Sequence, residues 1–144
     1  MPKVDFYVLD DTAPDAHLRL TCRLSEKAVD AGQKVFIRTA SAEESKRVDD
    51  LLWTFGDRSF LPHELASPSA PSHEKIHILI GEQEAPAGFR DLVINFAANA
   101  PTELDAVGQV AEIVLADPER KRQARERFKH YRDRALQPET HTVA

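Results

Sequence analysis

The strongest concentration of chemically active side chains in this sequence is a basic segment near its C-terminus. Residues 117–135 hold eight Lys or Arg and four Asp or Glu, a local charge of +4. The rest of the chain has 11 basic and 20 acidic residues, a charge of −9. A cationic segment on an acidic body indicates a binding site for an anionic partner. The simpler alternative is a solvated surface helix with intrahelical ion pairs, such as Arg122 with Glu126.

The basic segment also has the pattern of a helix. Asp117 can cap its N-terminus, Pro118 suits the first helical position, and Glu119 suits the positive end of the helix dipole. At about 100° per residue, a narrow apolar stripe adjoins a row of cations, so the helix is expected to pack through its aromatic side chains and expose cations beside them. The stripe comprises Ala124, Phe128, Tyr131 and Ala135, and the row comprises Lys121, Arg125, Lys129 and Arg132.

An acidic pair, Asp10 and Asp11, follows the first predicted strand and could hold Mg²⁺. Such chemistry also needs partner acids and a lysine at neighbouring strand ends. The third predicted strand instead runs into Gly81 and Glu82, and the fourth ends at Asn95 and Phe96. We therefore expect local helix capping here. A Mg²⁺-dependent hydrolase that uses Asp10 and Asp11 stays as the enzymatic alternative.

Residues 73–77 read H-E-x-x-H, a zinc-binding pattern when both His lie on one helix face. Here the pattern follows Pro71 and runs into a predicted strand, where His73 and His77 would lie about 13 Å apart, too far to share a metal. The sequence has no glycine-rich phosphate loop and no G-x-S-x-G motif. No metal, cofactor or catalytic residue is therefore predicted.

A second candidate surface is the segment 53–65, WTFGDRSFLPHEL, which carries the only Trp of the chain. It also holds two Phe and is interrupted by Gly56 and Pro62. One interpretation is core filling beneath a loop. The other is an exposed apolar anchor for a partner, because Trp and Phe in turns are frequent binding hot spots.

Composition narrows the classes of protein. A length of 144 residues suits one domain, and 42% apolar and 30% charged residues are typical of a globular protein. Cys22 is the only cysteine and lies in an apolar helical pattern, which indicates a buried structural thiol. No apolar run approaches the ~20 residues of a membrane span and no signal-peptide pattern is present, so we expect a cytoplasmic protein. The net charge of −5 argues against a general nucleic-acid binder.

The elements that would position these residues alternate between strands and helices. Strands are predicted at 4–9, 34–38, 76–80 and 92–96, and helices at 12–31, 41–52, 102–115 and 117–135. Gly32 is expected to end the first helix, and Ser41 with Glu44 to cap the second. Residues 1–135 would form a single domain and residues 136–144 a flexible tail. The alternation predicts a three-layer α/β domain with a mostly parallel sheet and helices on both faces.

Four stretches in collinear order carry a resemblance to a known family. They are FYVLD at 6–10, the run through Gly32 to KVFI at 34–37, LLW at 51–53 with SFLPH at 59–63, and ARERFKHYR at 124–132. The ordered set resembles the chi subunit of bacterial DNA polymerase III over residues 4–134. No single stretch is specific to this family. The resemblance rests on the order of all four stretches along the chain.

The resemblance implies a non-enzymatic accessory subunit of the clamp-loader complex, with a nucleotide-binding-like α/β fold that lacks the phosphate loop. It implies that the protein binds the acidic C-terminal tail of single-stranded DNA-binding protein. It also implies pairing with the psi subunit, which tethers chi to the clamp loader. In some members a helicase-like repair protein uses the psi-facing surface.

The resemblance also assigns residues to the tail-binding site. By family position these are Arg125, Phe128 and Lys129, with Lys121, Arg132 and Tyr131 beside them. The family often has Tyr where this chain has Phe128, so a hydroxyl is missing here. Arg125 could grip the terminal carboxylate of the tail with two hydrogen bonds, and Lys129 could act as a point charge. Contacts of this kind contribute about 1.5–3 kcal/mol each, so we expect micromolar affinity that weakens with salt.

The psi-facing surface implied by the resemblance includes Trp53 and Phe60, with Phe55 and Pro62 nearby. A remaining alternative from the residues alone is that the basic helix binds single-stranded DNA directly, with bases stacked on aromatic rings beside cations. The charge of −9 outside the basic segment makes repulsion of DNA the expected result.

Overall fold

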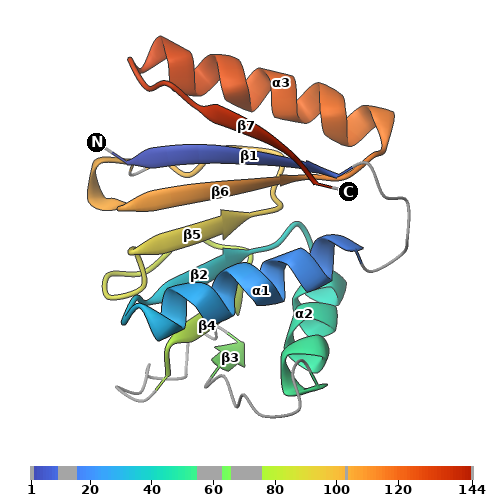
Figure 1. Ribbon diagram of the computed structural model, residues 1–144, viewed down its shortest axis with the longest axis vertical. Coiled ribbons are helices and arrows are strands. Elements are labelled where there is room, and N and C mark those ends of the chain that lie inside the picture. The colour runs from blue at the N-terminus through green and yellow to red at the C-terminus, as the bar shows by residue number, and fades with distance from the viewer. Residues whose placement is uncertain (1, 10–15, 55–62, 66–75, 103, 144) are drawn as a thin grey trace.

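Seven parallel strands form one sheet in this computed structural model, which describes residues 2–9, 16–54, 63–65, 76–102 and 104–143 (Figure 1). The strand order is β3-β4-β2-β5-β6-β1-β7. The strands are β1 (Lys3–Leu9), β2 (Val35–Arg38), β3 (His63–Leu65), β4 (Ile78–Gly81), β5 (Leu92–Asn95), β6 (Gln109–Val114) and β7 (Glu139–Val143). The predicted parallel sheet is confirmed.

Helices cover both faces of this sheet, so the predicted three-layer arrangement is confirmed. The helices are α1 (Ala16–Asp30), α2 (Ala42–Thr54) and α3 (Pro118–Asp133), with a short 3-10 helix η1 (Leu104–Ala106). Leu18 of α1 and Leu52 of α2 belong to the core cluster on one face. Tyr131 of α3 belongs to the cluster on the opposite face, together with Phe6 of β1. Figure 1 shows α3 along the β1–β7 end of the sheet.

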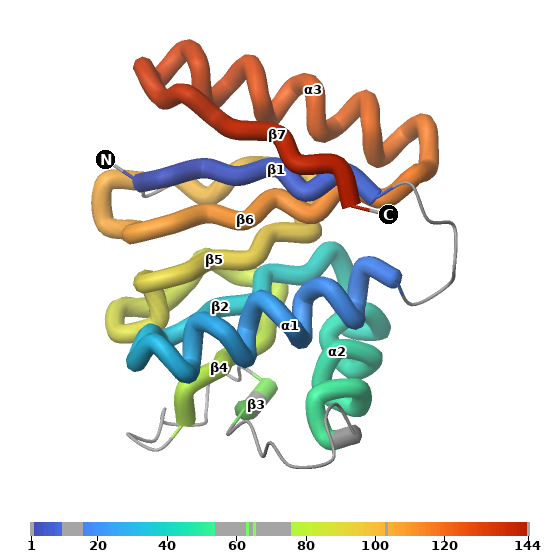
Figure 2. Tube along the Cα trace, viewed as in Figure 1, coloured from blue at the N-terminus to red at the C-terminus, as the bar shows by residue number. Residues whose placement is uncertain are grey.

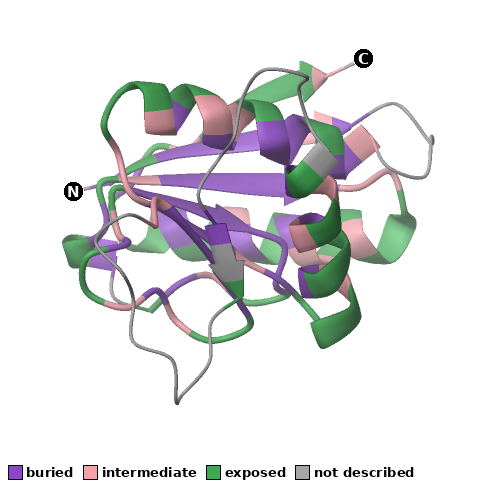
Figure 3. Ribbon diagram, turned by 90° about the horizontal axis from the view of Figure 1, so that it is seen from below, coloured by how far each residue is buried: buried purple, intermediate pink, exposed green. Residues whose placement is uncertain are grey.

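The central strands are buried on both sides, as Figure 3 shows. β4 and β5 are buried at every residue. Their sequences, ILIG and LVIN, are continuous apolar runs rather than alternating ones, which is typical of parallel strands between two helical layers. In the described parts of the chain, no helix is long and apolar enough to cross a membrane.

Three predicted helix caps, at Asp117, Ser41 and Gly32, are confirmed. The Asp117 carboxylate accepts a hydrogen bond from the Arg120 backbone N–H at 3.0 Å. Ser41 Oγ accepts from the Glu44 N–H at 3.1 Å, which caps α2 as expected. Gly32 has φ +80° just beyond α1, where a residue without Cβ adopts the left-handed conformation at low cost.

The helix predicted over residues 102–115 is wrong. Among the residues of this range that the structure describes, only η1 is helical, and β6 runs between β5 and β1. The run QVAEIV is almost entirely buried and does not alternate cleanly between apolar and polar residues, and such a run fits a buried helix and a buried strand equally well by periodicity. Gly108 lies just before β6, where a Cβ would be 2.9 Å from the Asp91 carbonyl oxygen, so glycine permits the close approach of the chain at the starts of β5 and β6.

The C-terminal tail also differs from the expectation. Residues 139–143, expected to be frayed, form β7 and pair in parallel with β1 (Figure 2). Without them β1 would be an open edge with unpaired backbone groups. Leu136 is 8% exposed and packs in the core, so the chain is anchored just before the strand begins.

Candidate functional site

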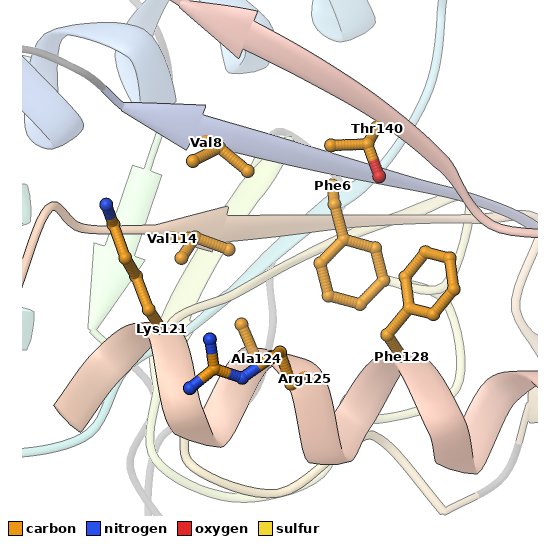
Figure 4. A pocket seen from close by; sticks show the side chains of 8 residues that line it. All are labelled: Phe6, Val8, Val114, Lys121, Ala124, Arg125, Phe128 and Thr140. Atoms are coloured by element: carbon orange, nitrogen blue, oxygen red, sulfur yellow. The ribbon is translucent and has the colours of Figure 1, made fainter. Parts of the chain in front are cut away.

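Two adjoining pockets lie along α3, and together we call them the α3 groove. The first has a volume of about 220 Å³ and lies between α3 and the sheet (Figure 4). The second has a volume of about 390 Å³ and lies further along the helix. Arg125 and Phe128 line both pockets. The first is also lined by Phe6, Val8, Val114, Lys121, Ala124 and Thr140, and the second by Lys129, Arg132 and Asp133.

The structure brings together five of the six residues predicted for tail binding. The four cations follow one another at intervals of four, four and three residues on α3, and therefore share one side of the helix, where Phe128 lies beside Lys129. The four cations are exposed and Phe128 is half-buried. The groove residues that match the prediction are Lys121, Arg125, Phe128, Lys129 and Arg132.

An apolar floor lies between these cations and the sheet. The Phe128 ring packs against the Phe6 ring of β1 with their centroids 5.3 Å apart (Figure 4). Val8 and Val114 extend the floor along β1 and β6, and Thr140 of β7 closes one side. Sequence reasoning missed all of these floor residues except Phe128. The alternation in β1 places Phe6 and Val8 on one face, but it does not say which helix covers that face.

Tyr131 is wrongly placed by the sequence prediction. Its side chain is 0% exposed, so a partner in the groove does not touch it. The hydroxyl donates a hydrogen bond to the Glu112 carboxylate, and the ring meets Phe6 edge-on at 5.9 Å. Burial, assisted by the charge of Glu112, strongly raises the pKa of Tyr131, so the hydroxyl keeps the proton that it donates. Tyr131 therefore supports the groove from below.

Arg127 forms a buried ion pair beneath α3 that the sequence reasoning missed. It is 5% exposed, and its Nε donates to Glu112 Oε1 at 2.9 Å. Asn95 Nδ2 donates to the same carboxylate at 3.0 Å. Burial raises the pKa of Glu112, while the Arg127 charge and these hydrogen bonds act to lower it. The available signal was position, because Arg127 falls three residues after Ala124 and thus on the inward face.

The family is decided by comparison with known proteins. A family model described as the DNA polymerase III chi subunit, HolC, matches residues 1–139. The chain belongs to the DNA polymerase III chi subunit family. These are accessory subunits of the replicative polymerase, as the sequence analysis expected.

Individual chi subunits agree with this assignment. The DNA polymerase III subunit chi of Pseudomonas aeruginosa is 35% identical over 143 residues, which cover 99% of this chain and 98% of that protein. The chi subunit of Escherichia coli is 29% identical, with 92% of each chain covered. That of Haemophilus influenzae is also 29% identical, with 88% of each covered.

A solved structure shares the fold of this chi-family chain. The crystal structure of T4 UvsW matches with a TM-score of 0.66 and 9% sequence identity. The match covers 98% of this chain and 41% of the UvsW chain. At this identity the likeness concerns the fold alone.

The second candidate surface of the chi-family chain is described only in part. α2 continues beyond the predicted end at Leu52, so Trp53 stands in its last turn. The Trp53 side chain is 58% exposed, and its ring lies 4.7 Å from the His63 ring of β3. The other residues predicted for this surface, Phe55, Phe60 and Pro62, lie outside the described residues. The exposure of Trp53 favours an anchor over core filling.

The remaining sequence candidates have separate outcomes. Asp10 and Asp11, as well as His73 and Glu74 of the H-E-x-x-H pattern, lie outside the described residues. Cys22 is 0% exposed, which confirms the buried thiol. Desolvation, with a smaller contribution from Glu26, raises the pKa of Cys22 to about 12. The thiolate is therefore scarce at neutral pH, as a structural role requires.

Proposed function

We propose that the α3 groove binds the acidic C-terminal tail of single-stranded DNA-binding protein, and so links that protein to the replicative polymerase. The observation that carries the proposal is the combination of a cationic rim with an apolar floor. Arg125 and Phe128 belong to both pockets of the groove, so charge and ring contacts are available at one point.

The floor fits the aromatic end of such a tail. A cavity of about 150 Å³ is large enough to bind benzene. The first pocket, at about 220 Å³, therefore has room for a phenylalanine ring, which would pack against Phe6 and Phe128. Arg125 stands at the entrance, where its guanidinium could bind the terminal carboxylate in a bidentate manner.

The rim fits the acidic residues that precede the ring. Lys129 and Arg132 line the second pocket beside Arg125, and Asp133 is the acid among its lining residues. Lys121 lies at the far side of the first pocket. An extended peptide that follows the helix would therefore meet cations along its length. Exposed charge pairs contribute little singly, so the buried ring and the carboxylate contact would supply most of the affinity.

A calorimetric titration tests the proposal. The full chain is titrated with a synthetic acidic peptide that ends in Asp-Phe. We expect micromolar binding by the wild type. Arg125→Glu should weaken it at least about 10-fold, because one charge-assisted contact of ~1.5–3 kcal/mol becomes a repulsion. Higher salt should also weaken wild-type binding, because the rim charges are exposed.

Arg122→Glu is the matched control. It makes the same charge change three residues away, but Arg122 lines neither pocket and pairs with Glu119 and Glu126 on the helix surface. Its effect on binding should be less than 3-fold, as expected for a long-range charge effect screened over about 10 Å. Equal loss of peptide affinity in both variants, or no binding by the folded wild type, would contradict the α3 groove as the peptide site.

Trp53 supports a separate surface for a second partner, which we assign to the psi subunit or, in its place, a helicase-like repair protein. Its ring is exposed at the end of α2, whereas the groove belongs to α3. Trp53→Ala should therefore weaken a psi-type partner and leave affinity for the peptide unchanged. If folded Trp53→Ala lost affinity for both the psi-type partner and the peptide, the two surfaces would not be independent.

A further inference from the structure

Three potential metal ligands converge at the β1–β7 edge, apart from the groove. Asp5, Glu139 and His141 each offer one ligand atom, and these atoms all lie within 4.8 Å of one another. His141 Nε2 is 2.9 Å from Asp5 Oδ1 and 3.9 Å from Glu139 Oε2. One imidazole and two carboxylates are donors that zinc accepts.

The strand register holds this trio together. In the parallel pairing of β1 with β7, Asp5 stands opposite Glu139 and Tyr7 stands opposite His141. Residues two apart on a strand point to the same face, so Glu139 and His141 share a face. The intervening Thr140 lines the α3 groove on the other face. The convergence is therefore a consequence of the fold.

Neighbouring side chains orient two of the three ligands. Gln109 Nε2 donates to Asp5 Oδ2 at 3.0 Å, which leaves Oδ1 directed at His141. The Tyr7 ring stacks on the His141 ring, with centroids 5.1 Å apart and 24° between the planes. Hydrogen-bonded partners such as Gln109 orient carboxylate ligands in metal sites, and the stacked Tyr7 ring restricts rotation of the imidazole.

Burial of the Asp5 carboxylate favours a cationic partner. Its carboxylate is 2% exposed, and a buried charge is normally paired or bound to a metal. The His141 and Glu139 side chains are 44% and 63% exposed, so an ion can reach the site from solvent. A direct Asp5–His141 ion pair is the alternative way to compensate the buried carboxylate.

We infer that Asp5, Glu139 and His141 form a zinc site that joins the C-terminal strand β7 to β1. Tetrahedral zinc with bonds of about 2.0–2.2 Å places its ligand atoms roughly 3.3–3.6 Å apart. The observed separations of 2.9 and 3.9 Å lie on either side of that range, and Glu139 is exposed enough to rotate. Water would complete the coordination. Mg²⁺ and Ca²⁺ fit less well, because they prefer oxygen ligands throughout.

A bound ion would also hold one wall of the α3 groove. Because Thr140 lies between two of the ligands, fixing Glu139 and His141 fixes its position beside Phe6. This consequence rests on the proposed tail binding. The zinc site itself does not, so a failed zinc titration and a failed peptide titration are separate results.

The experiment is a calorimetric titration of the metal-free full chain with Zn²⁺ alone. We expect one Zn²⁺ per chain for the wild type and loss of that stoichiometric site in His141→Ala. Gln109→Ala should weaken binding about 10–100-fold through the misoriented Asp5 carboxylate. His130→Ala, which removes an exposed His on α3, is the matched control and should bind like the wild type.

Hydrogen exchange supplies an independent readout at the strand. Zn²⁺ should slow exchange of the β7 amides in the wild type and leave it unchanged in His141→Ala, because a cross-strand ion stabilises only the state in which β7 is paired. Absence of wild-type binding, or equal binding by His141→Ala, would overturn the site. In that event the Asp5–His141 contact is an ion pair only.

Discussion

Basic residues of α3 lie in two contrasting environments. Lys121, Arg125, Lys129 and Arg132 are exposed at the groove, whereas Arg127 is buried against Glu112. The buried pair also receives hydrogen bonds from Asn95 and Tyr131, so the Glu112 carboxylate is surrounded by donors. The exposed set is accessible to a partner, and the buried residue fixes the helix on the sheet.

Arg127→Ala is therefore predicted to destabilise the fold by about 3–5 kcal/mol, because it leaves the Glu112 carboxylate buried without its cation. Urea unfolding followed by circular dichroism measures the change. Arg125→Ala on the same helix is the control and should shift stability by no more than about 0.5 kcal/mol, because its side chain is exposed. A loss below 1 kcal/mol in Arg127→Ala would mean that Glu112 is satisfied without the pair.

Prediction of single residues from the sequence succeeded where helical spacing decides which side chains are exposed. It failed where a side chain contacts residues from distant parts of the sequence. The spacing placed the four cations correctly on one side of α3. It could not reveal that Glu112 faces Arg127, since these residues are brought together by the packing of α3 on β6. The same limit hid Phe6 and Thr140, which reach the groove from the first and last strands.

At the scale of elements, α1 and α3 end in the same hydrogen-bonded motif with different residues. The Gln33 N–H donates to the Ala28 carbonyl after α1, and the Leu136 N–H donates to the Tyr131 carbonyl after α3. The left-handed position of this motif holds Gly32 at φ +80° in α1 and Ala135 at φ 64° in α3. A Cβ in that conformation is unfavourable, so α3 ends with some backbone strain.

Ala135→Gly is predicted to stabilise the protein by about 0.5–1 kcal/mol, because relief of the left-handed penalty exceeds the extra chain entropy of glycine. Thermal unfolding measures the effect. The mirror substitution Gly32→Ala should destabilise the protein by a similar amount, since it places a Cβ in the same conformation. If both substitutions changed stability in the same direction, backbone strain at Ala135 would not be the cause.

The elements differed in how well sequence predicted them. Helix α3 carries its own signals, namely the Asp117 cap, Pro118 and the spaced apolar residues, so it was predicted within two residues at its C-terminal end. β6 lacks such signals, because a strand buried on both faces loses its alternation. β7 is mostly exposed and gains its structure from pairing with β1, which no local pattern reports.

The whole molecule places its two candidate partner surfaces at opposite ends of the sheet. The α3 groove uses β1 and β7, the last strands in the order, whereas Trp53 contacts His63 on β3, the first strand (Figure 1). Two partners could therefore bind at the same time. The net charge of −5 disfavours nucleic acid as the groove's occupant, and the eight Lys and Arg within residues 117–135 provide a local cationic site for a short acidic peptide.

The central claim is that the acidic tail binds in the α3 groove, and the most direct test maps the contact by NMR. Backbone amide shifts would be recorded while unlabelled peptide ending in Asp-Phe is added to the isotopically labelled chain. The account predicts that changes concentrate on residues 121–132 of α3, with further changes at Phe6 and Thr140, and that Trp53 stays unaffected. Changes centred on the end of α2 and β3, with α3 unaffected, would contradict it.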